Sequence, residues 1–323
     1  MAILEVKDLC VDYETKKGTA RAVNHVNFSI NKGETLGLIG ESGCGKTTTA
    51  MSLLGFVSPP GRITGGSVIF KGEDIRNYND EQMRKLRGAS ISIVRQEAQN
   101  ALNPVLRVGD QIGEVLREHG EKNNKLIEER IDYQLEMVGI SPKRKKSYPF
   151  EFSGGMRQRV MIALAAIAEP DLMILDEPIT GLDVIVQRQL INLLAELRAK
   201  MGLTALLISH DLSVIAEMSD RVAVMYGGYI AEEADVVSLY KNSKHPYSSA
   251  LIESYPRIRG EKKTLKSIPG APPKLLTPPD GCMFADRCQK AKDICFKQVP
   301  ESVVVDGHRL RCHLYSGNSK GGV

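Results

Sequence analysis

A glycine-rich run, GESGCGKT, spans Gly40 to Thr47 and is the first segment whose residue types could do chemistry. It comes directly after the apolar run Thr35 to Ile39, a predicted strand, and directly before a predicted helix. Glycines let successive backbone N–H groups curl around a phosphate, and the helix N-terminus adds its partial positive charge. A chance glycine-rich turn would require neither this spacing nor this context, so the run predicts a nucleoside triphosphate site.

Two side chains of this phosphate loop have expected roles of their own. Lys46 would reach the β- and γ-phosphates, and the hydroxyl of Thr47 would bind Mg²⁺. The residues expected to contact nucleotide or Mg²⁺ here are Gly40, Ser42, Gly43, Cys44, Gly45, Lys46, Thr47 and Thr48.

Two adjacent carboxylic acids end the apolar run LMILDEP, Leu172 to Pro178. Open α/β sheets hold their ligands at the carboxyl ends of their strands, where Asp176 and Glu177 would lie. Asp176 would position Mg²⁺, directly or through water, and Glu177 would orient and polarise the attacking water. The ordinary alternative is an acidic loop after a buried strand, and a phosphate loop in the same chain favours the catalytic interpretation.

Gln96 follows the run ISIVR and His210 follows ALLIS, so each polar side chain would end a predicted strand. A lone glutamine or histidine is usually a satisfied surface or core group. Here both would lie at the same sheet edge as the phosphate loop, where Gln96 would contact Mg²⁺ and water and His210 the γ-phosphate.

The segment FSGGM, Phe152 to Met156, opens a long predicted helix. Ser153, Gly154 and Gly155 would present a hydroxyl and backbone N–H groups at a helix N-terminus, which makes a second anion site. The alternative is an ordinary N-cap by Ser153, which this segment taken alone favours.

The rest of the pattern predicts the elements that must position these groups. Short apolar runs alternate with amphipathic helical stretches to about residue 235, which predicts an α/β fold with a largely parallel sheet covered on both faces. The stretch 97–152 is mainly helical, with a stripe of Ile127, Ile131, Leu135 and Val138. The predicted strands are 3–13, 22–30, 35–39, 90–94, 172–175, 205–208 and 222–225. We expect a nucleotide-binding core at 1–96 and 153–240, a helical insertion at 97–152, an extension or linker at 241–268 and a cysteine-rich domain at 269–323.

Composition narrows the class of protein. The chain is 42% hydrophobic and 25% charged, as in ordinary soluble globular proteins. The longest apolar run, Val160 to Ala168, is too short to span a bilayer, and no signal sequence is indicated. A formal net charge of +4 is too small to argue for a nucleic-acid partner.

Together these motifs closely resemble the nucleotide-binding subunits of ABC transporters, in which the signature usually reads LSGGQ. The resemblance implies a P-loop ABC fold with an N-terminal antiparallel β subdomain and an inserted helical subdomain. It also implies that Gln96 is the glutamine loop, His210 the switch histidine, and that Tyr13 stacks on adenine. Two such domains bind head to tail in that family, so Ser153, Gly154, Gly155 and Asp183 would contact the ATP held by a partner chain.

A longer resemblance points to the dipeptide and oligopeptide permease branch, which also includes nickel and some oligosaccharide importers. It rests on the segment HPYSSALIESYP (245–256), the stretch IPGAPP and the terminal cysteines. It implies an ATPase on the cytoplasmic face of the membrane that hydrolyses ATP with Mg²⁺. Its partners would be a second, identical or homologous ATPase, two integral-membrane permease subunits and, indirectly, an extracytoplasmic substrate-binding protein.

Two other classes of protein fit less well. DNA-repair members of the family carry very long coiled-coil insertions, and ribosome-acting members usually fuse two cassettes, whereas this chain has one phosphate loop and a short insertion. A nucleotide kinase or GTPase would lack a signature like SGG before a helix. Exporters usually fuse the cassette to membrane helices, so import is favoured.

The C-terminal cysteines are Cys282, Cys288, Cys295 and Cys312. A small segment with little apolar core needs a covalent or metal staple, and disulfides are disfavoured in a cytosolic ATPase. Zinc or an iron–sulfur cluster remains, and zinc sites usually pair their cysteines at shorter gaps. Resemblance to peptide-permease ATPases that carry a 4Fe–4S cluster favours the cluster, with zinc second. His308 and His313 are alternative ligands, although we expect them to be surface histidines.

Overall fold

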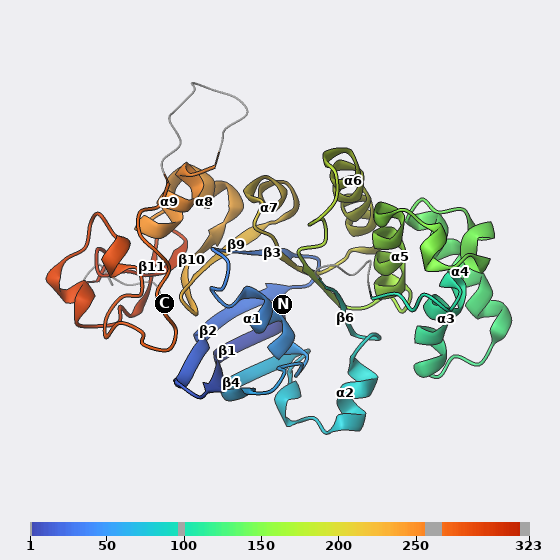
Figure 1. Cartoon of the computed structure of the whole chain (residues 1–323), viewed down its shortest axis with the longest axis horizontal. Coiled ribbons are helices and arrows are strands. Elements are labelled where there is room, and N and C mark those ends of the chain that lie inside the picture. The colour runs from blue at the N-terminus through green and yellow to red at the C-terminus, as the bar shows by residue number, and fades with distance from the viewer. Residues whose placement is uncertain (1, 96–100, 256–266, 317–323) are drawn as a thin grey trace. The chain divides into compact units, whose positions relative to one another are not determined.

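The computed structural model of the chain describes residues 2–95, 101–255 and 267–316. The chain divides into two compact units. The first unit comprises residues 1–3, 30–35 and 77–208, and the second comprises residues 4–29, 36–76 and 209–323. Figure 1 labels the elements of both. Among the described residues, no helix has the length and apolar composition needed to cross a lipid bilayer.

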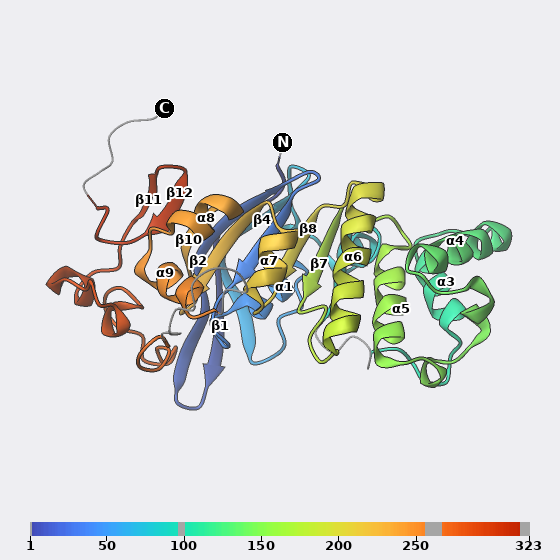
Figure 2. The same cartoon turned by 90° about the horizontal axis from the view of Figure 1, so that it is seen from above.

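The first unit contains the parallel strands β6 (Ile91–Val94), β7 (Leu172–Asp176) and β8 (Ala205–Ile208), with β7 in the middle. Every residue of β7 and β8 is buried, as expected for near-continuous apolar strands covered on both faces. Helices α5 (Gly154–Ala166) and α6 (Val184–Met201) lie side by side in this unit (Figures 1 and 2). The predicted helix stripe in α6 is largely confirmed, because Leu190, Leu193 and Leu197 are buried.

Helices α3 (Val108–Glu118) and α4 (Asn124–Met137) pack against each other and against α5 (Figures 1 and 2). The predicted stripe in α4 is confirmed, because Ile127, Ile131, Leu135 and Val138 are all buried. The remaining short helices of the first unit are α2 (Asp80–Leu86), η3 (Pro142–Lys146) and η4 (Pro149–Glu151). Helix η1 (Ile75–Asn77) lies at the point where the chain passes from the second unit to the first.

The second unit contains an antiparallel sheet with strand order β2-β1-β4-β5. Its strands are β1 (Ala2–Thr15), β2 (Gly18–Asn31), β4 (Gly61–Phe70) and β5 (Glu73–Asp74). The predicted strands 3–13 and 22–30 are confirmed as β1 and β2, whereas β4 was not predicted. Its GRITGGS sequence has few of the apolar residues that identify a strand.

A second set of strands in this unit has the order β11-β12-β10-β9-β3. Strand β3 (Thr35–Ile39) is parallel to β9 (Arg221–Tyr226), and β10 (Tyr229–Asp235) is antiparallel to β9. The C-terminal hairpin of β11 (Ser302–Val305) and β12 (His308–Arg311) extends this sheet, because β12 pairs with β10. The sequence did not predict the hairpin, and it ties the C-terminal extension into the sheet of the core.

The helices of the second unit are α1 (Lys46–Leu53), α7 (Leu212–Met218), α8 (Val236–Asn242) and α9 (Pro246–Glu253), followed by η5 (Ala285–Arg287) and η6 (Asp293–Phe296). Asp235 caps α8 and His245 caps α9, in each case by accepting backbone N–H groups of the first turn. Pro246 at the first position of α9 costs no hydrogen bond there.

Candidate nucleotide-binding site

The phosphate loop of the second unit begins where β3 ends and finishes where α1 begins. Two of its glycines leave no room for a side chain. Gly40 has φ of 153° and a Cβ there would lie 2.1 Å from the carbonyl oxygen of Met225; Gly45 has φ of 110° and its Cβ would lie 2.3 Å from that of Ala22. The backbone therefore comes close to neighbouring strands at both ends of the loop, which fixes its curvature.

Lys46 is buried and its Nζ donates to the carbonyl oxygens of Gly40, at 2.7 Å, and Glu41, at 3.1 Å. Burial raises the pKa of the Cys44 thiol, so Cys44 is a protonated, packed side chain of the loop. Ser42, Gly43 and Thr47 are exposed and Thr48 is partly exposed. The loop therefore offers accessible backbone and hydroxyl groups above a buried cation, which suits an anionic ligand.

Tyr13 lies near the end of β1, opposite Gly61 of β4. A Cβ at Gly61 would lie 2.6 Å from Cε1 of the Tyr13 ring, so the ring packs over the glycine backbone. The ring is partly exposed, which leaves part of its surface accessible.

The acidic pair belongs to the first unit. Asp176 is the last residue of β7 and is buried. Glu177 follows with φ of 49°, an unfavourable backbone conformation for a residue with a side chain. Its N–H donates to the carbonyl oxygen of Ile208 at 2.9 Å, and the Thr180 hydroxyl donates to its Oε2 at 3.0 Å. The bond to Ile208 fixes the backbone at Glu177, and the Thr180 hydroxyl orients its carboxylate, as a general base requires.

The signature segment lies at the N-terminus of α5 in the first unit. The Ser153 hydroxyl accepts the Met156 N–H at 3.4 Å and so caps the helix, and the first turn contains no acidic residue. A Cβ at Gly155 would lie 2.4 Å from Cγ1 of Val186, so glycine allows α5 to approach α6. Ser153 is therefore the N-cap of α5, Gly154 opens the helix beside it, and the second anion site stays a prediction.

Asp183 caps α6 in the first unit, because its Oδ1 accepts the N–H groups of Ile185, at 3.1 Å, and Val186, at 3.0 Å. Gln187 Nε2 donates to the carbonyl oxygen of Leu182 at 3.0 Å and steadies the preceding loop. Val184 and Ile185 beside the cap are 80% and 71% exposed, an unusual position for large apolar side chains.

The predicted nucleotide residues fall in both units. The phosphate loop, Tyr13 and His210 belong to the second unit, whereas Asp176, Glu177, Asp183 and the signature segment belong to the first. His210 is exposed and its carbonyl oxygen accepts the Tyr255 hydroxyl. Gln96 lies outside the described residues.

Two family models match this chain: ABC transporter, over residues 23–180, and oligopeptide/dipeptide transporter, C-terminal region, over residues 231–295. A dipeptide transport ATP-binding protein of Bacillus subtilis is 42% identical over 97% of this chain and 94% of that protein. An oligopeptide transport ATP-binding protein of Escherichia coli is 44% identical over 96% of this chain and 93% of its own length. The chain belongs to the ABC transporter family.

Solved structures of ABC cassettes agree with this assignment. A dimeric ATP-binding cassette in a post-hydrolysis state, bound to ADP and Pi, has a TM-score of 0.65 and 25% identity, and covers 72% of this chain and 98% of its own. A cassette of Clostridium perfringens has a TM-score of 0.65 and 28% identity, and covers 75% of this chain and 91% of its own. The chain is therefore an ABC-type ATPase, and membership implies ATP and Mg²⁺ as its ligands. The Thr47 hydroxyl and the Asp176 carboxyl are oxygen ligands of the kind that Mg²⁺ prefers.

The predicted metal site in the C-terminal extension is not supported by the geometry. Burial raises the pKa of Cys282 to about 11, and the nearby thiols of Cys312, Cys295 and Cys288 raise it further. Burial also raises the pKa values of Cys288 and Cys312. Within residues 2–95, 101–255 and 267–316, no group of three or more Cys, His, Asp or Glu side chains is placed to hold a metal ion. Burial thus favours the protonated forms of Cys282, Cys288 and Cys312, and a metal would have to deprotonate them.

The prediction of surface histidines is wrong for His308. This side chain is buried, and its Nδ1 lies 2.7 Å from Oε1 of Glu232. His313 contacts the carbonyl oxygen of Gln298 through Nε2 at 2.8 Å.

Three residues at the phosphate loop were not predicted from the sequence, namely Glu41, Tyr247 and Arg287. Glu41 lies inside the motif, but the motif assigns no role to its second position. Tyr247 lies in the segment HPYSSALIESYP, and the proline directly before it was a usable signal that a helix starts there. No sequence pattern marks Arg287, which meets Glu41 only in the folded chain.

Proposed function

We propose that this chain is the ATP-hydrolysing subunit of a transporter that imports dipeptides or oligopeptides. One observation carries the proposal. Relatives named for dipeptide or oligopeptide transport match 96–97% of the chain, including the C-terminal extension. A match to the cassette alone would identify the motor without any indication of the cargo.

In this proposal the phosphate loop and Lys46 bind the ATP phosphates, and Tyr13 stacks on adenine. Mg²⁺, held by Thr47 and Asp176, would neutralise the charge that develops on the phosphates. Glu177 orients and polarises the attacking water, as its constrained backbone and its bond from Thr180 favour. Gln96 contacts Mg²⁺ and water, and His210 contacts the γ-phosphate.

A second ATPase chain, identical or homologous, completes each site head to tail. The signature residues Ser153, Gly154 and Gly155 and the loop residue Asp183 would contact the partner's ATP. Two features support this: the start of α5 lacks acidic residues, and the exposed apolar pair Val184 and Ile185 adjoins Asp183. ATP would close the two chains, and loss of the γ-phosphate would let them reopen.

The helical region of the first unit would transmit this motion to two integral-membrane permease subunits. Large apolar side chains are exposed there, at Val105 (75%), Leu106 (40%) and Phe150 (70%), and a bond from Val108 N–H to Ser147 carbonyl ties their two loops together. The chain would then work at the cytoplasmic face of the membrane. It would serve an extracytoplasmic substrate-binding protein only indirectly, and nucleic acid would have no part.

Replacement of the proposed base tests the ATPase mechanism. Glu177→Gln should lower ATP turnover by about a hundredfold or more, while ATP affinity stays within about threefold. The variant should also accumulate as an ATP-bound dimer in size-exclusion chromatography, because the amide preserves contacts but cannot polarise water. Glu196→Gln is the matched control, since Glu196 is an exposed residue of α6 that pairs with Lys200 at 3.7 Å. Near-normal turnover in Glu177→Gln would remove Glu177 from its role.

Uptake by cells tests the cargo. Cells that lack this chain should regain uptake of a labelled dipeptide or tetrapeptide with the wild-type gene, but not with Glu177→Gln. Peptide uptake that does not depend on the chain, together with chain-dependent nickel uptake, would contradict the proposed cargo and leave the ATPase intact.

The finer proposal for the extension is a structural 4Fe–4S cluster held by Cys282, Cys288, Cys295 and Cys312, with zinc second. Four cysteines within residues 282–312, in a segment with little apolar core of its own, support it, and metal binding would have to deprotonate them. Anaerobically purified full-length protein should be brown and contain about four iron atoms per chain. One zinc and no iron would overturn the cluster, and four alkylatable thiols without metal would overturn metal binding altogether.

A further inference from the structure

Glu41, the second residue of the phosphate loop, forms a two-point ion pair with Arg287 of the C-terminal extension. Arg287 Nη1 donates to Glu41 Oε2 at 2.6 Å and Nη2 donates to Oε1 at 2.9 Å. A guanidinium that meets both carboxylate oxygens fixes the direction as well as the position of its partner. The Glu41 side chain therefore cannot turn without breaking two charged hydrogen bonds.

Arg287 is itself held rigidly, with a side chain that is only 5% exposed. Its Nε donates to the carbonyl oxygen of Pro269 at 2.7 Å, and its Nη1 also donates to the Tyr226 hydroxyl at 3.0 Å. The proline-rich connector and the core strand β9 thus both orient the guanidinium.

Tyr247 holds the backbone of the same loop residue. Its hydroxyl oxygen accepts the N–H of Glu41 at 2.9 Å, and its ring is fully buried. The rings of Tyr226 and Phe284 pack against it, with centroids 4.4 Å and 5.3 Å away. Burial raises the pKa of Tyr247, which keeps the hydroxyl neutral.

The connector also lines the loop. Pro272, Pro273 and Leu275 border a small cavity together with the loop segment 41–44. Because Lys46 Nζ donates to the Glu41 carbonyl oxygen, every polar group of Glu41 has a partner: the N–H, the carbonyl and both carboxylate oxygens. All these residues belong to the second unit.

We propose that Arg287 and Tyr247 are positioning residues through which the C-terminal extension sets the conformation of the phosphate loop, and thereby its affinity for ATP. Both residues reach the loop through Glu41. A loop that is already curved for phosphate loses less conformational entropy when ATP binds. The proposal needs only that the loop binds nucleotide, so it stands or falls separately from the peptide cargo.

Arg287 is carried by the cysteine-rich segment of the C-terminal extension. It lies in η5, between Cys282 and Cys288. Any change that reshapes this segment must move the guanidinium or strain its bonds to Glu41. The extension therefore acts on the ATP site, whatever else it contacts.

Substitution of Arg287 in the full chain tests the proposal. Arg287→Ala should raise the KM for ATP about tenfold, with kcat within about twofold, and weaken ATP binding measured by calorimetry about equally. Tyr247→Phe keeps the ring packing and removes only the acceptor of the Glu41 N–H, so KM should rise about threefold. Arg309→Ala is the matched control, because Arg309 lies in the same extension and pairs with Glu233 at 3.7 Å, away from the loop. It should leave KM unchanged.

A double-mutant cycle separates positioning from mere support of the fold. If Arg287 acts through Glu41, adding Glu41→Gln to Arg287→Ala should raise KM no further, whereas independent effects would multiply. Should Arg287→Ala fail to fold, Glu41→Gln and Tyr247→Phe carry the test by themselves, each with raised KM. ATP affinity within twofold of wild type in all the folded variants, even with lower melting temperatures, would overturn the proposal.

Discussion

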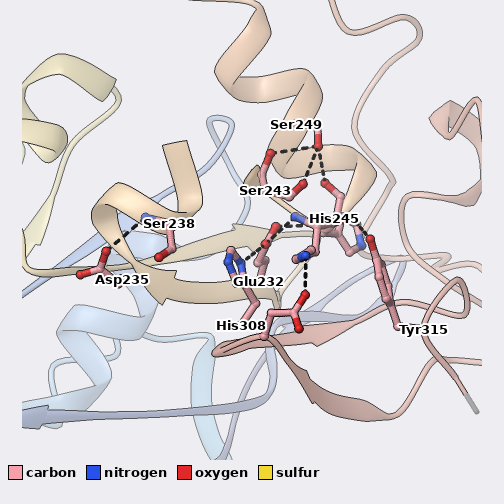
Figure 3. A network of polar contacts seen from close by, with 10 residues as sticks. Glu232, Asp235, Ser238, Ser243, His245, Ser249, His308 and Tyr315 are labelled. Atoms are coloured by element: carbon pink, nitrogen blue, oxygen red, sulfur yellow. Dashed lines mark hydrogen bonds and ion pairs between the residues drawn. The ribbon is translucent and has the colours of Figure 1, made fainter. Parts of the chain in front are cut away.

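Two acidic side chains of the second unit, Glu41 and Glu232, receive the C-terminal segments of the chain in different ways. Glu41 is 23% exposed and meets a guanidinium. Glu232 is completely buried and accepts the N–H groups of Lys244, at 2.7 Å, and His245, at 2.9 Å, and also contacts His308 Nδ1 at 2.7 Å (Figure 3). One carboxyl group lies at the phosphate loop, and the other is buried on strand β10.

The difference in burial separates two roles. If Glu232 loses a hydrogen-bond partner, a buried polar group is left without a bond that water could replace. The free energy of unfolding should then fall by a large part of its total. The Glu41 carboxylate is 23% exposed, so water can reach it when its partner is lost, and its pair with Arg287 determines where a phosphate-binding backbone lies. We therefore expect damage at Glu232 to appear in unfolding, and damage at Glu41 to appear in ATP affinity.

The segment between the two sites links them covalently. Lys244 and His245 donate to Glu232, and Tyr247, two residues later, accepts from Glu41. His245 Nδ1 also accepts the Tyr247 N–H at 3.0 Å, which starts helix α9 (Figure 3 shows His245 beside Glu232). To compare the two sites, a substitution must therefore alter the contacts of Glu232 and leave the bond between Tyr247 and Glu41 in place.

A fall in pH should produce the largest change in stability, and it acts through His245, which donates to Glu232. Burial lowers the pKa of His245 from 6.5 to about 4, against the opposing effect of Glu232 and of a backbone bond with Arg311. The unfolded chain takes up the proton first, so stability from this group is complete above about pH 6.5 and is lost as the pH falls to about 4. The loss should be on the order of 3 kcal/mol, measured by denaturant unfolding at a series of pH values.

A variant that cannot titrate isolates this effect. His245→Asn retains a side chain that caps helices but carries no titratable ring, so its acid-induced loss should be smaller than that of the wild type. His313→Asn is the matched control, because His313 contacts only the Gln298 carbonyl and a nearby serine hydroxyl, and it should keep the wild-type loss. Equal losses in all three proteins would exclude His245 as the cause.

A smaller change should follow from His308→Ala. The substitution removes the extension's hydrogen bond to Glu232 and leaves both backbone bonds, from Lys244 and His245, in place. The free energy of unfolding should fall by about 2 kcal/mol, while the KM for ATP stays within about twofold. Thermal or denaturant unfolding and steady-state hydrolysis measure the two quantities.

The control for His308→Ala lies on the same hairpin. Asp306 pairs with Lys244 Nζ at 2.7 Å but is 73% exposed, and its φ of 49° is a conformation that asparagine also tolerates. Asp306→Asn should change neither unfolding nor KM measurably, since exposed pairs contribute little. A KM for ATP raised as much by His308→Ala as by Arg287→Ala would break the separation between the two sites.

The elements that carry the ATPase motifs were predictable because their signals are local. The apolar run Thr35 to Ile39 forms β3 with the predicted bounds, and the glycine spacing after it makes the loop before α1. The stripe through α4 is buried as its helical spacing predicts. Such elements depend on the types and spacing of residues that are close in the sequence, so a single sequence is enough to predict them.

The cysteine-rich end was predicted less well. Its lack of an apolar core led to the prediction of a metal staple, which stays a prediction. The hairpin β11–β12 was not predicted, and it is held by pairing with β10 and by the buried contact of His308 with Glu232. Strand pairing between β10 and β12 depends on backbone groups, which every residue type carries, and leaves little trace in the side-chain pattern. The prediction for His308 was wrong for the same reason, because no neighbour in the sequence indicates its burial.

The sequence by itself determined that a phosphate loop, an acidic strand end and a second helix N-terminus exist in this chain, and with them its family. The tertiary structure decided what holds the loop in place. Arg287 and Glu41 are 246 positions apart, and Tyr247 and Glu41 are 206 apart. Spacing rules for helices, strands and turns act over a few residues, whereas these contacts depend on how the connector and the extension fold back onto the core.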